Sequence, residues 1–164
     1  EILIGLVGSE MCIRDRAEGV HTNLDTSGNP FTDQEPWHSG WLELMKYTDL
    51  VMLDIKQIDE QEHIKLTGHS NKNILAMARE LSDMKKPVWI RHVLVPDGSD
   101  KDEYLHRLAD FIHTLSNVER VEVLPYHTLG KFKWENLGLS YPLEGVNPPT
   151  QERIDNARKI LGAI

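Results

Sequence analysis

Cysteine is almost missing from this sequence, which contains only Cys12 among its 164 residues. A single thiol cannot form a disulfide within the chain, and it cannot supply the several thiolates that a cysteine-based zinc or iron–sulfur site needs. The cysteine content therefore excludes a disulfide-stabilised fold and a cysteine-ligated metal centre built from this chain alone.

Long apolar runs and an excess of basic charge are missing as well. No run approaches the roughly 18 apolar residues that cross a bilayer, and Glu1–Arg16 lacks the basic start and apolar middle of a signal peptide. We therefore expect a cytoplasmic protein with no membrane partner. The net charge is −8. Because binding to phosphates needs clustered Lys and Arg, we also expect no nucleic-acid partner.

Several catalytic motifs are absent too. The sequence has no Gly-rich phosphate loop, no Gly-x-Ser-x-Gly elbow and no usable Cys-His pair, which disfavours nucleotide-hydrolysing enzymes and hydrolases. Its content of 40% hydrophobic and 27% charged residues is typical of one globular domain.

Four apolar, strand-like runs are present, and each ends in polar or charged residues. Strands that alternate with helices at this spacing predict an α/β fold with a parallel sheet of βαβ units, in which functional side chains gather at the carboxyl ends of the strands. The polar endings are therefore the candidate site. The runs are Val20–Leu24, Leu50–Leu53, Val88–Val95 and Val118–Leu124, and they end in Asp25-Thr26-Ser27-Gly28, Asp54-Ile55-Lys56, Pro96-Asp97-Gly98 and Pro125-Tyr126-His127.

Apolar residues at helical spacing predict helices between and after these strands. A parallel sheet of four strands has a bare edge and an uncovered face, so the pattern is typical of part of a barrel. The predicted helices are Asp33–Tyr47, Asn71–Met84, about Lys101–Leu115 and a last one from Thr150 to the chain end, whereas Lys131–Asn147 is expected to be a surface excursion.

The first sixteen residues differ from the rest. The portion GSEMCIRDR resembles a peptide that arises when sequencing-adapter DNA is translated. We therefore expect residues 1–16 to be a non-native tail and residues 17–164 to form the domain. An ordinary first strand over Ile2–Val7, followed by a turn at Gly8-Ser9, is the alternative.

The ending Asp54-Ile55-Lys56 carries the most specific chemistry. The period of two along a strand puts Met52, Asp54 and Lys56 on one face and Ile55 on the other. If that face points into a barrel mouth, Asp54 and Lys56 can pair and together bind a zwitterionic or hydroxyl-bearing ligand. A purely structural ion pair is the alternative.

Other strand endings add to this site. Asp25 and Asp54 can meet across adjacent strands, and two carboxylates with the Thr26 hydroxyl suit a hard cation that takes oxygen ligands. One alternative is an unrelated metal-dependent barrel enzyme that uses both carboxylates. Another is that Asp25 is only a turn residue. Arg91 can face the same mouth. His127 is either a ligand contact or a surface residue, and the other seven histidines show no metal-ligand spacing.

From Ala17 to Gly162 the chain resembles the later part of the pyruvate formate-lyase-activating enzymes, which are glycyl-radical enzyme activases of the radical S-adenosylmethionine superfamily. The order and spacing of four segments carry the resemblance. These segments are Leu24-Asp25-Thr26-Ser27-Gly28, the run from Tyr47 to Lys56 (YTDLVMLDIK), the run from Val88 to Pro96 (VWIRHVLVP) and the run from Leu124 to Lys131 (LPYHTLGK).

The resemblance implies a partial (β/α) barrel of six βα units, of which this chain keeps the last four, with the N-terminal units missing. In the family, a 4Fe-4S cluster reductively cleaves S-adenosylmethionine to a deoxyadenosyl radical. That radical abstracts hydrogen from a glycine of pyruvate formate-lyase, and the electron comes from a donor such as flavodoxin or ferredoxin.

Residue roles follow from the same resemblance. By position, Asp54, Ile55 and Lys56 would contact S-adenosylmethionine, and His127 would lie against its adenosine portion. A monovalent cation beside the cofactor would be held by Asp25, Thr26, Met52 and Asp54.

The sequence departs from the family at one point that decides activity. The Cys-x-x-x-Cys-x-x-Cys motif that binds the cluster is absent. We therefore expect the chain as it stands to be an inactive fragment of an activase. A cluster-free binding module and an activase of another glycyl-radical enzyme are the alternatives.

Overall fold

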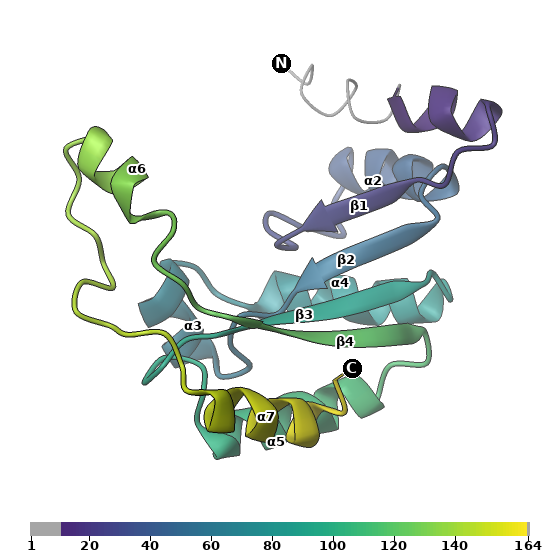
Figure 1. Ribbon diagram of the computed structural model, residues 1–164. Helices are drawn as coiled ribbons and strands as arrows, with labels where there is room; N and C mark the ends of the chain where they lie inside the picture. The colour runs from purple at the N-terminus through teal and green to yellow at the C-terminus, as the bar shows by residue number, and fades with distance from the viewer. Residues whose placement is uncertain (1–10, 164) are drawn as a thin grey trace.

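The computed structural model describes residues 11–163 and contains one parallel sheet of four strands (Figure 1). The strands are neighbours in the order β1-β2-β3-β4, which is also their order along the chain. The predicted α/β class, with four parallel strands alternating with helices, is confirmed. The strands are β1 (Asn23–Thr26), β2 (Leu50–Asp54), β3 (Val88–Leu94) and β4 (Val118–Pro125).

Within residues 18–163 six helices accompany the strands, and the four predicted ones are present with shorter bounds. α2 begins four residues after Asp33, directly behind Pro36. Thr150 caps α7 as expected, because its Oγ1 accepts a hydrogen bond from the Arg153 amide at 3.3 Å. The helices are α2 (Trp37–Lys46), α3 (Glu60–Thr67), α4 (Lys72–Asp83), α5 (Asp102–His113), α6 (Lys131–Asn136) and α7 (Gln151–Leu161).

Three expectations need correction. α6 lies within the stretch expected to be a surface excursion without a predicted helix, and α3 lies where no helix was predicted. The first strand begins at Asn23 instead of Val20. Thr22, the residue before it, donates its amide to the Asp49 side chain at 2.9 Å, while its carbonyl accepts from the Leu50 amide at 3.2 Å.

The amino-terminal segment is described only from residue 11, and residues 11–17 are helical. The alternative strand over Ile2–Val7 lies outside the described residues. The division into a non-native tail and a domain from residue 17 stays a prediction.

Alternation along the strands separates the two faces of the sheet. Val51, Leu53 and Ile55 are almost fully buried on the face that α2 and α4 cover (Figure 1), where Met77 and Leu81 of α4 join the same core. α7 packs against α5 and β4 at the other end of the sheet.

The opposite face carries the polar side chains. Met52, Asp54, Trp89 and Arg91 lie on it and are half-buried. Within residues 11–163 no helix lies over this face, so we call it the open face (Figure 1). None of the helices in this part of the chain is both long and apolar enough to cross a bilayer.

Candidate functional site

Two aspartates at the carboxyl ends of β1 and β2 are joined by an arginine of β3. Asp25 pairs in register with Met52, and Asp54 pairs with Arg91. The Nε of Arg91 donates to Asp54 Oδ1 at 2.9 Å, and its Nη2 lies 2.9 Å from Asp25 Oδ1. Its Nη1 donates to Asp25 Oδ2 at 3.0 Å. Asp25 and Asp54 therefore lie together, as predicted, with a guanidinium between them.

The surroundings of Arg91 favour its charged form. Its side chain is 18% exposed, and that of Asp54 is 14% exposed. Partial burial alone would lower the pKa of Arg91, but the hydrogen bond and charge of Asp54, followed by those of Asp25, outweigh burial and raise that pKa above its ordinary value. Arg91 is thus a fixed cation at this edge.

Lys56 adds a second, more loosely held cation. Its Nζ lies 3.8 Å from Asp54 Oδ2, and its side chain is 37% exposed, so the predicted pairing of the two residues is confirmed. Both residues border a pocket of about 180 Å³ between the end of β2, the turn after β1 and the α3–α4 region. Its lining residues are Ser27, Asn29, Asp54, Lys56, His63, Thr67, His69 and Ile74.

The turn after β1 lines one side of this pocket. The Gly28 amide donates to Thr26 Oγ1 at 3.0 Å. Gly28 has a φ of +72°, and a Cβ at this position would lie 3.0 Å from Leu53 Cδ1. The backbone therefore approaches the core at a point where only glycine fits without rearrangement.

The residues expected to bind a cation through oxygen atoms lie at paired or adjacent positions of β1 and β2, because Asp25 is paired with Met52. However, the Asp25 and Asp54 carboxylates are already bound by Arg91, so a bound cation would compete with this guanidinium. The cation site at Asp25, Thr26, Met52 and Asp54 stays a prediction. Among residues 11–163 no group of three or more His, Cys, Asp or Glu side chains is placed to hold a metal ion.

His127 follows β4 at the same edge of the sheet and is exposed. Its ring makes no hydrogen bond with another residue in the 11–163 range. The preceding Tyr126 is buried, and its hydroxyl lies 2.7 Å from that of Tyr141, which ties the start of the excursion to its far side. His127 is therefore available to a ligand but is not joined to the Asp25–Arg91–Asp54 group.

Sequence reasoning left two features of this edge undecided. The direction of Arg91 was open, and only the register of β3 against β2 brings it to Asp54. His92 is one of the seven histidines without metal-ligand spacing, yet it is buried, with Nδ1 2.9 Å from the Ile55 carbonyl oxygen. Strand alternation around Arg91 and His92 was the available signal for both.

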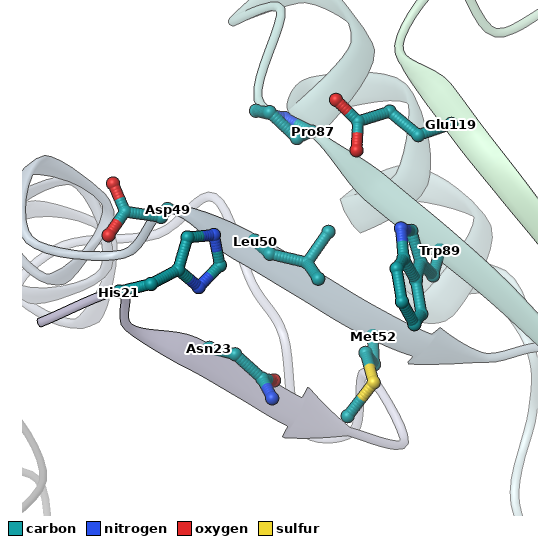
Figure 2. Close-up of a pocket in the computed structure, with 8 residues that line it drawn as sticks. All are labelled: His21, Asn23, Asp49, Leu50, Met52, Pro87, Trp89 and Glu119. Carbon is teal, nitrogen blue, oxygen red and sulfur yellow. The ribbon is translucent and has the colours of Figure 1, made fainter.

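A second pocket, of about 360 Å³, lies on the open face near the amino-terminal ends of the strands (Figure 2). In Figure 2 Asp49 and Glu119 lie at opposite sides of it, so its charged groups do not converge on one point. Met52 and Trp89 contribute apolar surface to its lining. This pocket lacks the paired charges of the carboxyl edge, and we take the carboxyl edge as the candidate site.

Comparison with solved structures supports the architecture. A domain of a pyruvate-formate lyase-activating enzyme from Bacteroides vulgatus superposes with a TM-score of 0.77 at 20% identity, over 98% of this chain and 87% of that one. A radical SAM methyltransferase from Sphaerobacter thermophilus gives 0.61 at 17% identity, over 88% and 39%. These likenesses show that the fold is part of a radical SAM barrel.

Sequence comparison is more specific. No protein-family model matches the chain. The pyruvate formate-lyase-activating enzyme of Streptococcus mutans is 54% identical over 146 residues, which cover 89% of this chain and 56% of the relative. That of Staphylococcus epidermidis is 55% identical and is covered to 58%. The chain spans little more than half the length of these curated relatives, and over that length it is a homologue of the pyruvate formate-lyase-activating enzymes.

Proposed function

We propose that this chain forms the S-adenosylmethionine-binding part of a glycyl-radical enzyme activase whose protein substrate is pyruvate formate-lyase. The observation that carries the proposal is the group Asp25, Arg91, Asp54 and Lys56 at the carboxyl edge of the sheet, in a chain 54% identical to such an activase. The electron donor would be a small redox protein such as flavodoxin or ferredoxin.

The charges of the group suit this ligand. S-adenosylmethionine carries a carboxylate, an ammonium group, a sulfonium centre and ribose hydroxyls. Lys56 is partly exposed and only loosely paired, so its ammonium group can bind a carboxylate. Asp54 uses one oxygen for Arg91 and keeps lone pairs for a hydroxyl or ammonium donor. Ile55, between them, and the exposed His127 would complete the contacts.

The iron–sulfur cluster of the family does not fit these residues. It needs three protein thiolates, and the sequence has one cysteine. We therefore assign binding and orientation of S-adenosylmethionine to this chain, and no step of its cleavage.

Binding tests the proposal directly. We expect the chain to bind S-adenosylmethionine in isothermal titration calorimetry, and Lys56→Met and Asp54→Asn each to weaken binding by about tenfold or more, because a hydrogen bond to a charged group contributes about 1.5–3 kcal/mol. Lys159→Met and Asp110→Asn, which change exposed residues of α7 and α5, are the matched controls. Absence of binding by the unaltered chain would overturn the proposed function, and equal binding by all four variants would overturn the site.

The single cysteine favours a second candidate, a cluster-free binding module. Both candidates predict the same outcome for the chain alone: after anaerobic incubation with iron and sulfide it should retain no 4Fe-4S cluster and form no deoxyadenosine. Iron and acid-labile sulfide analysis, with chromatography of the nucleoside products, measures this. Retention of a cluster together with deoxyadenosine would contradict the expectation. Copurification of a different glycyl-radical enzyme would instead favour an activase of that enzyme.

A further inference from the structure

We infer that His92 is a positioning residue that holds the Asp54-Ile55-Lys56 backbone in place from the helix-covered side of the sheet. For its effect on ligand binding the inference rests on the proposed function. Its effect on the backbone at the end of β2 does not depend on the proposed function.

Two consecutive residues of β3 contact the end of β2 on opposite faces of the sheet. Arg91 extends onto the open face and binds the Asp54 side chain. His92 extends to the other face, where its Nδ1 lies 2.9 Å from the Ile55 carbonyl oxygen. The Ile55 amide donates to the Arg91 carbonyl at 2.9 Å. The end of β2 is therefore held by a side-chain contact on each face of the sheet and by a backbone hydrogen bond to β3.

The other side of the ring faces the turn after β3. Nε2 of His92 lies 3.2 Å from the Ser99 carbonyl oxygen. Ser99 is itself fully buried. Its Oγ donates to the Val93 carbonyl at 2.6 Å and accepts from the Val95 amide at 2.9 Å. His92 thus packs between the end of β2 and this hydrogen-bonded turn.

Neighbouring side chains continue this connection. The Gln57 side chain is buried, and its Nε2 donates to the Gly98 carbonyl at 2.8 Å. Asn71 Nδ2 donates to the carbonyls of Gln57 and Ile58 at 3.0 and 2.8 Å. Within this network, His92 is the side chain that contacts Ile55, the residue between Asp54 and Lys56.

Both ring nitrogens face carbonyl oxygens, which can only accept. Burial lowers the pKa of His92 from its ordinary value, against the raising effects of the Ile55 and Ser99 carbonyls and of the Asp100 charge. The ring is therefore neutral at neutral pH and has one N–H to donate. We assign that proton to Nδ1 because the contact to Ile55 is the shorter of the two.

Amide replacements separate the two contacts. Asn places its amide nitrogen near the position of Nδ1, whereas Gln reaches the position of Nε2. We expect His92→Asn to keep the Ile55 hydrogen bond and to bind S-adenosylmethionine within about twofold of the unaltered chain. His92→Gln and His92→Leu should each weaken binding by about fivefold, which corresponds to the loss of one neutral hydrogen bond.

Hydrogen–deuterium exchange of the ligand-free chain gives a second readout. Amides 55–58 should exchange at least about fivefold faster in His92→Gln and His92→Leu than in His92→Asn, since the opening free energy falls by one hydrogen bond. Asn117→Ala is the matched control. It removes a hydrogen bond to the Lys86 carbonyl at the amino-terminal end of β4, far along the strand from this network.

The outcomes separate the two proposals. Equal exchange at amides 55–58 in His92→Asn and His92→Gln would overturn the role of His92, and so would an equal acceleration by Asn117→Ala. If His92→Leu does not fold, the comparison of Asn with Gln still decides. Failure of the unaltered chain to bind S-adenosylmethionine would overturn the proposed function, while the exchange data would still decide the role of His92.

Discussion

Replacing Gly28 with alanine is expected to destabilise the chain by about 2–5 kcal/mol, the sum of a left-handed backbone cost of about 1–2 and an overpacking cost of about 1–3 kcal/mol. The backbone at Gly28 has a φ of +72°. An added Cβ would lie 3.0 Å from Leu53 Cδ1 and 3.3 Å from Ile74 Cα, and the second of these atoms is backbone that cannot turn away. Urea denaturation followed by circular dichroism measures the loss.

Gly68→Ala is the control for the backbone contribution. Gly68 ends α3 at a φ of +80°, but nothing lies within 4 Å of its added Cβ. We expect this variant to lose only about 1–2 kcal/mol, the backbone cost alone. Equal losses in the two variants would contradict the close approach of the turn after β1 to the core.

Arg91→Leu is expected to cost about 1–3 kcal/mol of stability, because it leaves the poorly exposed Asp54 and the neighbouring Asp25 without their shared cation. The melting temperature of a domain of this size should fall by about 2–4 °C for each kcal/mol. Affinity for S-adenosylmethionine should fall more than tenfold, since both carboxylates lose their fixed orientation. Differential scanning calorimetry and titration calorimetry measure the two effects.

Two further variants test the reason for this effect. Arg158→Leu removes an exposed arginine that pairs with Asp155 one helical turn away, and it should change stability by less than about 1 kcal/mol. Adding Asp25→Asn to Arg91→Leu should recover part of the stability because it removes one of the two neighbouring carboxylates that have lost the guanidinium. A double variant no more stable than Arg91→Leu alone would contradict carboxylate repulsion as the cause.

The strands and the four longer helices could be predicted because alternation and apolar stripes are local signals. α3 and α6 have no apolar stripe. The buried residue of α3 is His63, and α6 has no buried residue among those described. Their signals were caps and turns, such as Asp59 before α3, whose Oδ1 accepts a hydrogen bond from the Gln61 amide at 3.0 Å. These signals do not stand out against the many polar residues of the chain.

The site was predictable where its chemistry lies within one strand ending. Asp54 and Lys56 are two residues apart, and the strand period alone puts them on one face. The contact from Arg91 to Asp25 joins residues 66 positions apart, and that from His92 to Ile55 joins residues 37 positions apart. Contacts at such separations depend on the register between strands and on the turn after β3, which residue patterns do not reveal.

The order of the strands bears on how this sheet is made during synthesis. Each ladder joins strands that are consecutive along the chain, so β2 can add to β1, β3 to β2 and β4 to β3 as each leaves the ribosome. Among the four described strands, no later strand has to insert between two earlier ones. Each new strand in this part of the chain therefore pairs with the strand made just before it, and α7 then packs on α5 and β4.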